Sequence, residues 1–255
     1  MIIIKSRREI EAMRAAGRVA ALVLAAVGEA VRPGVRTREL DALAAEVMAQ
    51  HGAASADLGY QPDPHVPPYP ASICVSVNDQ VIHGVPGARR LAEGDVVGVD
   101  VTVKRQGFIG DAARTFAVGE LAPEAARLLQ VTEQALGAGI ARCWPGNHLS
   151  DVSNAIESVA RAAGYGIVRM YCGHGVGRSM HEEPEGPNYG RAGHGPLLQP
   201  GMTLAVEPMF NLGGHDVVVD RRDGWTVRTR DGSLSAHFEH TVAIGAEGPE
   251  LLTLP

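Results

Sequence analysis

Two aspartates, Asp100 and Asp111, have a spacing that can bring two carboxylates together. Residues 96–103 are rich in valine, residues 104–107 are polar and end in glycine, and residues 108–118 resume a strand-like pattern. We expect an antiparallel hairpin folded between Arg105 and Gln106, with Asp100 opposite Asp111 and Cβ atoms roughly 4.5–5.5 Å apart. A shared proton, a basic side chain or a metal cation would relieve the repulsion between these carboxylates. The alternative is a solvent-facing pair at the rim of the hairpin.

Three further ionisable residues stand in apolar, strand-like surroundings: His174 among glycines, Glu207 before Pro208, and Glu239 on the last long strand. One such residue alone would usually be a structural hydrogen-bond partner. Five that converge are harder to explain in this way, because an unpaired ionised carboxylate in an apolar setting costs several kcal/mol. Four carboxylates and one imidazole suit two divalent cations such as Mn, Fe, Co or Zn. Two-metal centres of this kind activate water and polarise carbonyl groups in hydrolases.

The composition excludes several classes of protein. The 255 residues are 45% hydrophobic with a net charge of −6, which is typical of a globular chain with a substantial core. No basic stripe indicates a direct nucleic-acid site, and no apolar run is long enough to span a membrane. Cys74, Cys143 and Cys172 are odd in number and far apart, so we expect reduced thiols and a cytoplasmic location.

Apolar residues at helical spacing, with Pro-Gly or Gly at the end of each run, predict four helices. They cover residues 6–31, 37–51, 123–143 and 150–164. Ser6 and Glu9 form a capping-box pattern at the first helix. Thr37 and Ser150 are the expected caps of the second and fourth helices. The segment between residues 57 and 70 contains too many prolines for a helix or a central strand.

The pattern of the first half is repeated in the second half. Pro33-Gly34 and Pro145-Gly146 are 112 residues apart, as are Gly52 and Gly164, and the segments that lead to Asp100 and Glu207 are 107 residues apart. We therefore expect one α+β domain over residues 1–255, built from duplicated halves of about 1–120 and 121–255. The sheets of the two halves would face one interior, where Asp100 approaches Glu207.

A series of motifs covers nearly the whole chain, and together they resemble the type I methionine aminopeptidase family. They are Val77-Asn-Asp-x3-His83-Gly, Asp95-x4-Asp100-Val-Thr, Gly107-x2-Gly-Asp111, Tyr171-Cys-Gly-His-Gly-Val-Gly-Arg178, His181-Glu-Glu-Pro184, Glu207-Pro-Met209 and Ser235-Ala-x2-Glu239-His-Thr241. The resemblance implies the pita-bread fold shared with prolidases and creatinase. That fold has two pseudo-symmetric α–β halves, with antiparallel sheet around a central metal site.

The resemblance also implies which residues would hold two divalent metal ions. Asp111 and Glu239 match carboxylates that bridge both ions, and Asp100 matches a ligand mainly of one ion. His174 and Glu207 match ligands of the other ion. The identity of the ions, among Co, Mn, Fe and Zn, stays open.

Catalytic and substrate-binding roles follow from the same resemblance. Glu207 would accept a proton, His181 would hydrogen-bond the scissile carbonyl oxygen, and His83 would face the peptide nitrogen. The alternative for both histidines is to hold metal ligands in place. An apolar methionine pocket would be lined by the side chains of Tyr69, Cys74, Met180 and Trp225, with Tyr60 a further candidate. Ordinary core packing is the alternative for Trp225.

Several positions depart from the family pattern. Asp57 stands where an apolar residue or cysteine is common, and Met180 replaces the usual Phe. His237 and Phe238 replace Gln and Tyr directly before Glu239, and Gly98 replaces an Asn. The loop over residues 61–70 is longer and richer in proline than usual. These changes leave the reaction class intact but put fine specificity and metal preference in question.

The resemblance implies removal of the initiator methionine from nascent polypeptides, preferring a small second residue. The expected partners are nascent N-termini, with the ribosome as a candidate contact, and we expect a monomer. Two alternatives stay open: a prolidase-like X-Pro hydrolase and a catalytically silent pita-bread binding protein. Prolidases usually carry an extra N-terminal domain before the first helix pair, and silent relatives would be expected to lose metal ligands.

Overall fold

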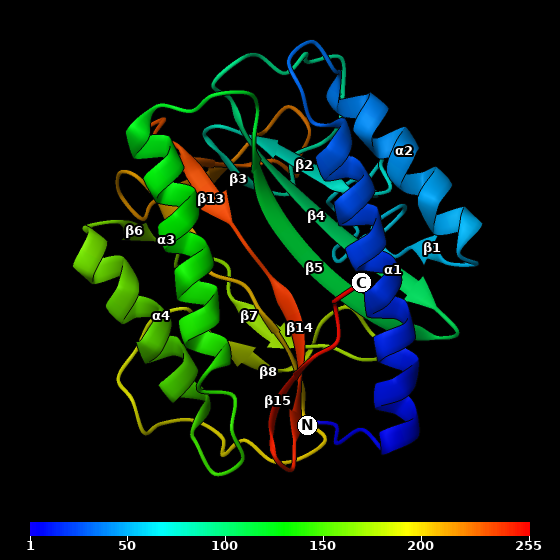
Figure 1. The fold of residues 1–255 in the computed structure, drawn as a ribbon, viewed down its shortest axis with the longest axis vertical. Helices are drawn as coiled ribbons and strands as arrows, with labels where there is room; N and C mark the ends of the chain where they lie inside the picture. Colours follow the sequence, from blue (N-terminus) through cyan, green and yellow to red (C-terminus); the bar gives the residue numbers. More distant parts are fainter.

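Four helices pack against antiparallel sheets in the computed structural model, which describes residues 1–255 (Figure 1). The helices are α1 (Arg7–Ala30), α2 (Thr37–Gln50), α3 (Pro123–Ile140) and α4 (Leu149–Ala163). The strands are β1 (Ala54–Ser55), β2 (Cys74–Val77), β3 (Gln80–Ile82), β4 (Val96–Arg105), β5 (Phe108–Ala117), β6 (Gly166–Ile167), β7 (Gly173–Gly175), β8 (Glu182–Gly186), β9 (Thr203–Val206), β10 (Met209–Asn211), β11 (Val217–Val219), β12 (Val227–Thr229), β13 (Ser235–His237), β14 (His240–Gly245) and β15 (Gly248–Leu251). None of the helices combines the length and apolar character needed to cross a lipid bilayer.

The first helix begins as the sequence predicts. The hydroxyl of Ser6 accepts a hydrogen bond from the Glu9 N–H, and the Ser6 N–H donates to the Glu9 carboxylate at 2.9 Å. This reciprocal capping box satisfies two amide groups that the helix itself leaves without partners. Helix α3 begins at Pro123 as expected but ends at Ile140, three residues before the predicted Cys143.

The predicted cap of the second helix is wrong. Helix α2 is capped at Arg36, whose N–H donates to the Glu39 carboxylate at 2.7 Å. The hydroxyl of Thr37 instead exchanges hydrogen bonds with the backbone of Gly87, at 2.8 and 3.2 Å. Thr37 therefore ties the helix to the loop that follows β3.

The predicted cap of the fourth helix is wrong in the same way. Helix α4 is capped at His148, whose N–H donates to the Asp151 carboxylate at 2.7 Å, while Ser150 accepts from the His194 N–H. His148 and Asp151 lie 112 residues after the equivalent pair of α2, which is the spacing found in the sequence. The duplication of residues 1–120 and 121–255 stays a prediction, and these matching caps favour it.

Each helix pair covers the sheet of its own half. In the first half, β4 lies between β1, β2 and β5, and α1 packs on the β4–β5 hairpin. In the second half, the strand order is β15-β14-β9-β7-β8, and α3 contacts β9, β10 and β13. Two smaller sheets, β13-β10-β6 and β11-β12-β3, complete the fold. Each half has a separate apolar core under its helices, so the expectation of an α+β fold with antiparallel sheet is confirmed.

The register of the β4–β5 hairpin differs from the prediction. Asp111 pairs with Thr102, and Asp100 pairs with Ala113. The two central turn residues are Gln106 and Gly107, with φ of 51° and 81°, so the hairpin folds between them. The pairing is displaced by two residues, which keeps Asp100 and Asp111 on one face as diagonal rather than direct neighbours.

The two halves meet where β5 lies beside the chain segment from β13 to β14, at the centre of the molecule (Figure 1). The Asp111 N–H donates to the Thr241 hydroxyl at 3.1 Å, and this hydroxyl donates back to the Asp111 carbonyl at 2.8 Å. Nearby, the Glu239 N–H donates to the Ala113 carbonyl at 2.9 Å. These bonds place Asp111 and Glu239 side by side. The long final strand expected here is interrupted, because Phe238 and Glu239 separate β13 from β14.

Helix α1 lies unusually close to β5. A Cβ atom on Gly110 of β5 would lie 2.3 Å from the backbone nitrogen of Gly17 in α1. A side chain at this position would therefore push the helix away from the strand that carries Asp111.

We expect Gly110→Ala to lower the free energy of unfolding by about 1–3 kcal/mol, because the added methyl group overpacks the helix–strand contact. Urea unfolding followed by circular dichroism measures this change. Gly137→Ala in α3 is the matched control, since its Cβ would meet nothing within 4 Å. The control should gain roughly 0.5–1 kcal/mol from the helix preference of alanine. Equal stability of Gly110→Ala and the unsubstituted protein would contradict the close contact.

Candidate metal centre and substrate pocket

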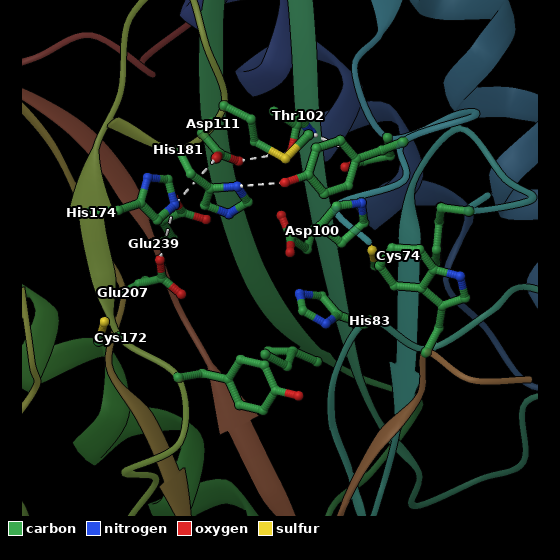
Figure 2. Close-up of a pocket in the computed structure, with 18 residues that line it drawn as sticks. Cys74, His83, Asp100, Thr102, Asp111, Cys172, His174, His181, Glu207 and Glu239 are labelled. Carbon is green, nitrogen blue, oxygen red and sulfur yellow. Dashed lines mark hydrogen bonds and ion pairs between the residues drawn. The ribbon is translucent and has the colours of Figure 1, made fainter. Parts of the chain in front are cut away.

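One cavity of about 440 Å³ collects all the residues that the sequence proposes for chemistry. They come from both halves and point into the same space, as Figure 2 shows for the labelled members. The cavity is lined by the proposed metal ligands Asp100, Asp111, His174, Glu207 and Glu239, the histidines His83 and His181, and the proposed methionine-pocket residues Tyr60, Tyr69, Cys74, Met180 and Trp225. Their roles stay predictions, but their convergence is a property of the fold.

The imidazole of His174 faces two carboxylates. Its Nδ1 lies 2.9 Å from the carbonyl oxygen of Gly175, which can only accept a hydrogen bond, so Nδ1 carries the proton. Burial lowers the pKa of His174 to about 4, and the ring is therefore neutral near pH 7. The bare Nε2 then lies 3.4 Å from Glu207 Oε1 and 4.0 Å from Asp111 Oδ2. Three acceptor groups thus face one another, an arrangement that a cation or a proton stabilises.

The carboxyl groups are strongly perturbed by burial. Glu207 and Glu239 are 8% and 3% exposed, and loss of water raises the pKa of both well above the usual range. Burial, with the nearby charges of Asp100 and Glu207, also raises the pKa of Asp111. Burial raises the pKa of Asp100 to about 6. These groups therefore either share protons or neutralise their charge with cations.

Two carboxylate oxygens in this cluster have no hydrogen-bond partner although they are buried: Asp100 Oδ1 and Glu239 Oε1. Buried polar atoms without partners are rare in folded proteins, because desolvation costs free energy that no bond returns. Three residues of the site also have metal-ligand atoms close together: one atom from each of Asp111, His174 and Glu239 lies within 4.8 Å of the other two. Oxygen donors with one imidazole nitrogen suit hard to borderline divalent metals.

Some lining residues were not identified from the sequence. Thr102 donates to Asp111 Oδ1 at 3.0 Å, and its place two residues after Asp100, on the same strand face, was a usable signal. The sequence marks Asp57 only as a departure from the family pattern. The structure buries its carboxyl in the cavity wall, where it accepts a hydrogen bond from the Thr102 N–H at 3.4 Å. Its position on a proline-rich loop does not predict that its carboxyl lies in the cavity wall.

The histidines His83 and His181 both line the cavity. His83 adopts φ of 56°, which is uncommon outside glycine and frequent at functional sites. The next residue, Gly84, holds this turn, because its carbonyl accepts from the Val75 N–H at 2.8 Å and the Tyr69 hydroxyl at 2.9 Å. A Cβ on Gly84 would lie 2.3 Å from the Val75 carbonyl oxygen, so only glycine fits there.

A hydrogen bond fixes the orientation of His181. The hydroxyl of Tyr60 lies 3.0 Å from Nδ1 of His181. When this hydroxyl donates, Nδ1 has no proton, and Nε2 of the neutral ring carries an N–H. The ring of His181 also packs at 4.5 Å, centroid to centroid, against His174. His181 can therefore present a donor to a ligand beside the carboxylate cluster.

Aromatic side chains form an apolar chamber next to the carboxylates. The rings of Tyr69 and Trp225 meet edge to face, with centroids 5.2 Å apart, and Cys74 and Ala71 pack with them. The indole N–H of Trp225 donates to the Pro67 carbonyl at 2.8 Å, so the proline-rich loop holds this wall. The chamber accommodates an apolar side chain of a bound ligand.

The sequence model of metallopeptidase family M24 matches residues 11–246 of this chain. The protein belongs to metallopeptidase family M24. A methionine aminopeptidase of Clostridium perfringens is 49% identical over 255 residues, covering 100% of this chain and 99% of that protein. Methionine aminopeptidase 1 of Bacillus subtilis is 43% identical over 253 residues and covers 99% of both chains. The resemblance predicted from the motifs is therefore confirmed.

Solved structures of M24 proteins match the whole chain. The methionine aminopeptidase of Rickettsia prowazekii superposes with a TM-score of 0.96 at 43% identity and covers 100% of both chains. The prolidase of Pyrococcus furiosus gives 0.79 at 23% identity, covering 99% of this chain and 66% of that one, which shows a shared fold alone. The predicted pita-bread fold is confirmed. Membership of a metallopeptidase family implies use of divalent metal, and the buried acceptor cluster fits that requirement.

We expect divalent cations to stabilise the folded protein more as the pH rises. Without cations, the raised pKa values keep Asp111, Glu207 and Glu239 protonated after the same groups of the unfolded chain have ionised. Their contribution to the free energy of unfolding therefore falls as the pH rises from about 4, the unfolded pKa, through the raised pKa values. Cations compete with these protons. The shift in melting temperature on adding Mn²⁺ should be small at pH 5 and large at pH 8.

The control for this measurement is Glu239→Gln, which removes one of the acidic groups and should reduce the Mn²⁺-induced shift at every pH. A shift that does not depend on pH, or that is as large in Glu239→Gln as in the unsubstituted protein, would contradict the proposed cation site.

Proposed function

We propose that this protein is a methionine aminopeptidase that removes the initiator methionine from new polypeptides, preferring a small second residue. The observation that carries this proposal is the apolar chamber directly beside the carboxylate cluster, in a chain similar along its full length to proteins named methionine aminopeptidase. The substrates would be nascent N-termini in the cytoplasm, with the ribosome as a candidate contact.

We further propose that the centre holds two divalent ions, drawn from Co, Mn, Fe or Zn. Four carboxylates carry a charge that two dications neutralise. Asp111 and Glu239 would contact both ions, Asp100 mainly one, and His174 and Glu207 the other. When bound, such ions lower the pKa of water and polarise a carbonyl group.

The protein's own side chains would carry out the proton transfer and hold the substrate. Glu207 would take a proton from the attacking water, because its carboxylate lines the cavity beside the other proposed metal ligands. His181 would donate from Nε2 to the scissile carbonyl oxygen, in the tautomer that Tyr60 holds. His83, which also lines the cavity, would face the peptide nitrogen. Burial lowers the pKa of His83 to about 4, so it would act as a neutral ring.

Substrate choice would come from the chamber. A methionine side chain is apolar and flexible, and it suits the contact with Tyr69, Trp225 and Cys74. Met180 and Tyr60 also line the cavity and would complete the wall. The preference for a small second residue is taken from the family resemblance, and no single side chain here accounts for it.

The substrate class can be tested with two peptides. Purified protein loaded with Co²⁺ or Mn²⁺ should release methionine from Met-Ala-Ser and no proline from Gly-Pro, and a chelator should abolish the release. Free amino acids measured by chromatography provide the readout. Release of proline but not methionine would favour the prolidase-like alternative. Release from neither peptide would favour the silent binding protein.

Glu207→Gln and His181→Ala should both depress turnover of Met-Ala-Ser. Loss of a general base or of an electrostatic donor typically costs about 10²–10³-fold in rate. Tyr60→Phe should lower kcat less than His181→Ala, because it removes only the hydroxyl that holds the tautomer. Steady-state kinetics of the three variants measure these effects, and unchanged kcat in Glu207→Gln or His181→Ala would refute the assigned role.

A further inference from the structure

His237 is buried against the metal centre, yet the proposed function gives it no role. It ends β13 and is 3% exposed. Its N–H donates to the Thr115 hydroxyl at 2.9 Å, and its carbonyl accepts from the same hydroxyl at 2.8 Å. Both halves of the molecule therefore fix the backbone from which the imidazole projects.

The imidazole of His237 is directed at Glu207. Its Nε2 lies 3.6 Å from Glu207 Oε2 and has no hydrogen-bond partner, although it is buried. The other oxygen, Oε1, lies 3.4 Å from Nε2 of His174. The carboxylate of Glu207 is thus held between two imidazoles, one of which offers a bare nitrogen.

We infer that His237 is a positioning residue whose Nε2–H faces Glu207 Oε2 across 3.6 Å, a polar contact just beyond hydrogen-bond length, and holds Oε1 toward His174 and the metal centre. The other tautomer would place a buried nitrogen lone pair against a carboxylate that can only accept, which leaves both atoms unsatisfied. A donor on Oε2 also restricts rotation of the carboxyl group, so that the favourable orientation for metal binding is formed in advance. This inference rests on the proposed function.

One observation separates His237 from the proposed ligands and catalytic groups. All of those residues line the cavity, whereas His237 does not, so a bound peptide would not touch it. It therefore acts through Glu207.

The test compares His237→Gln, His237→Asn and His237→Leu. The amide nitrogen of glutamine is as many bonds from Cα as Nε2 of histidine, whereas that of asparagine is one bond shorter. His237→Leu fills the space without a donor. We measure Co²⁺ affinity by calorimetry and the visible absorption spectrum of the Co²⁺-loaded protein, which reports the coordination of the metal. His148→Leu, a half-buried histidine outside the site, is the control substitution.

We expect His237→Leu and His237→Asn to bind Co²⁺ about 10–100-fold more weakly, with an altered spectrum, and His237→Gln to stay within a few-fold of the unsubstituted protein. Co²⁺ affinity and spectrum should be unchanged in His148→Leu. Equal affinity and spectra for His237→Gln and His237→Asn would overturn the inference, even if His237→Leu fails to fold. An unsubstituted protein that binds no Co²⁺ and releases no methionine would instead refute the proposed function.

Discussion

The whole structure depends on one electrostatic constraint, the burial of several carboxyl groups at the junction of two halves. Water cannot stabilise their charges there, and no lysine or arginine forms an ion pair with them. Each half alone is an ordinary sheet covered by helices, with its own apolar core. The charged groups gather only where the halves meet. The need for shared protons or compensating cations thus follows from the architecture.

The junction can accommodate these groups because hydrogen bonds to the backbone hold it together, and ion pairs between side chains do not. Thr241 exchanges hydrogen bonds with the backbone of Asp111, and Thr115 does the same with His237. The threonine hydroxyls both donate and accept, so they join the chain segments without adding charge. The carboxylates of Asp111 and Glu239 therefore form no ion pair with lysine or arginine at the junction. A junction fastened by ion pairs would have consumed those carboxylates.

The fold class could be predicted, as could the residues that line the cavity, because motif spacing and apolar periodicity are local signals. The hairpin register could not, since Gln106 adopts a positive φ that few residues other than glycine favour. The expected caps Thr37 and Ser150 have suitable side chains, but loops distant in sequence take their hydroxyls. His237 could be noted from the sequence only as a departure beside Glu239; its contact with Glu207 could not be predicted, because that contact joins strands far apart in the chain.

Strand pairing also links the metal centre to the substrate chamber. Cys74 of the chamber pairs with Asp100 across β2 and β4, so the apolar wall and a proposed ligand share one strand register. A slip of β2 by one residue would turn the Cys74 side chain to the opposite face of the sheet from Asp100, because successive residues of a strand alternate. One strand pairing therefore holds both the apolar wall and the proposed ligand in the cavity.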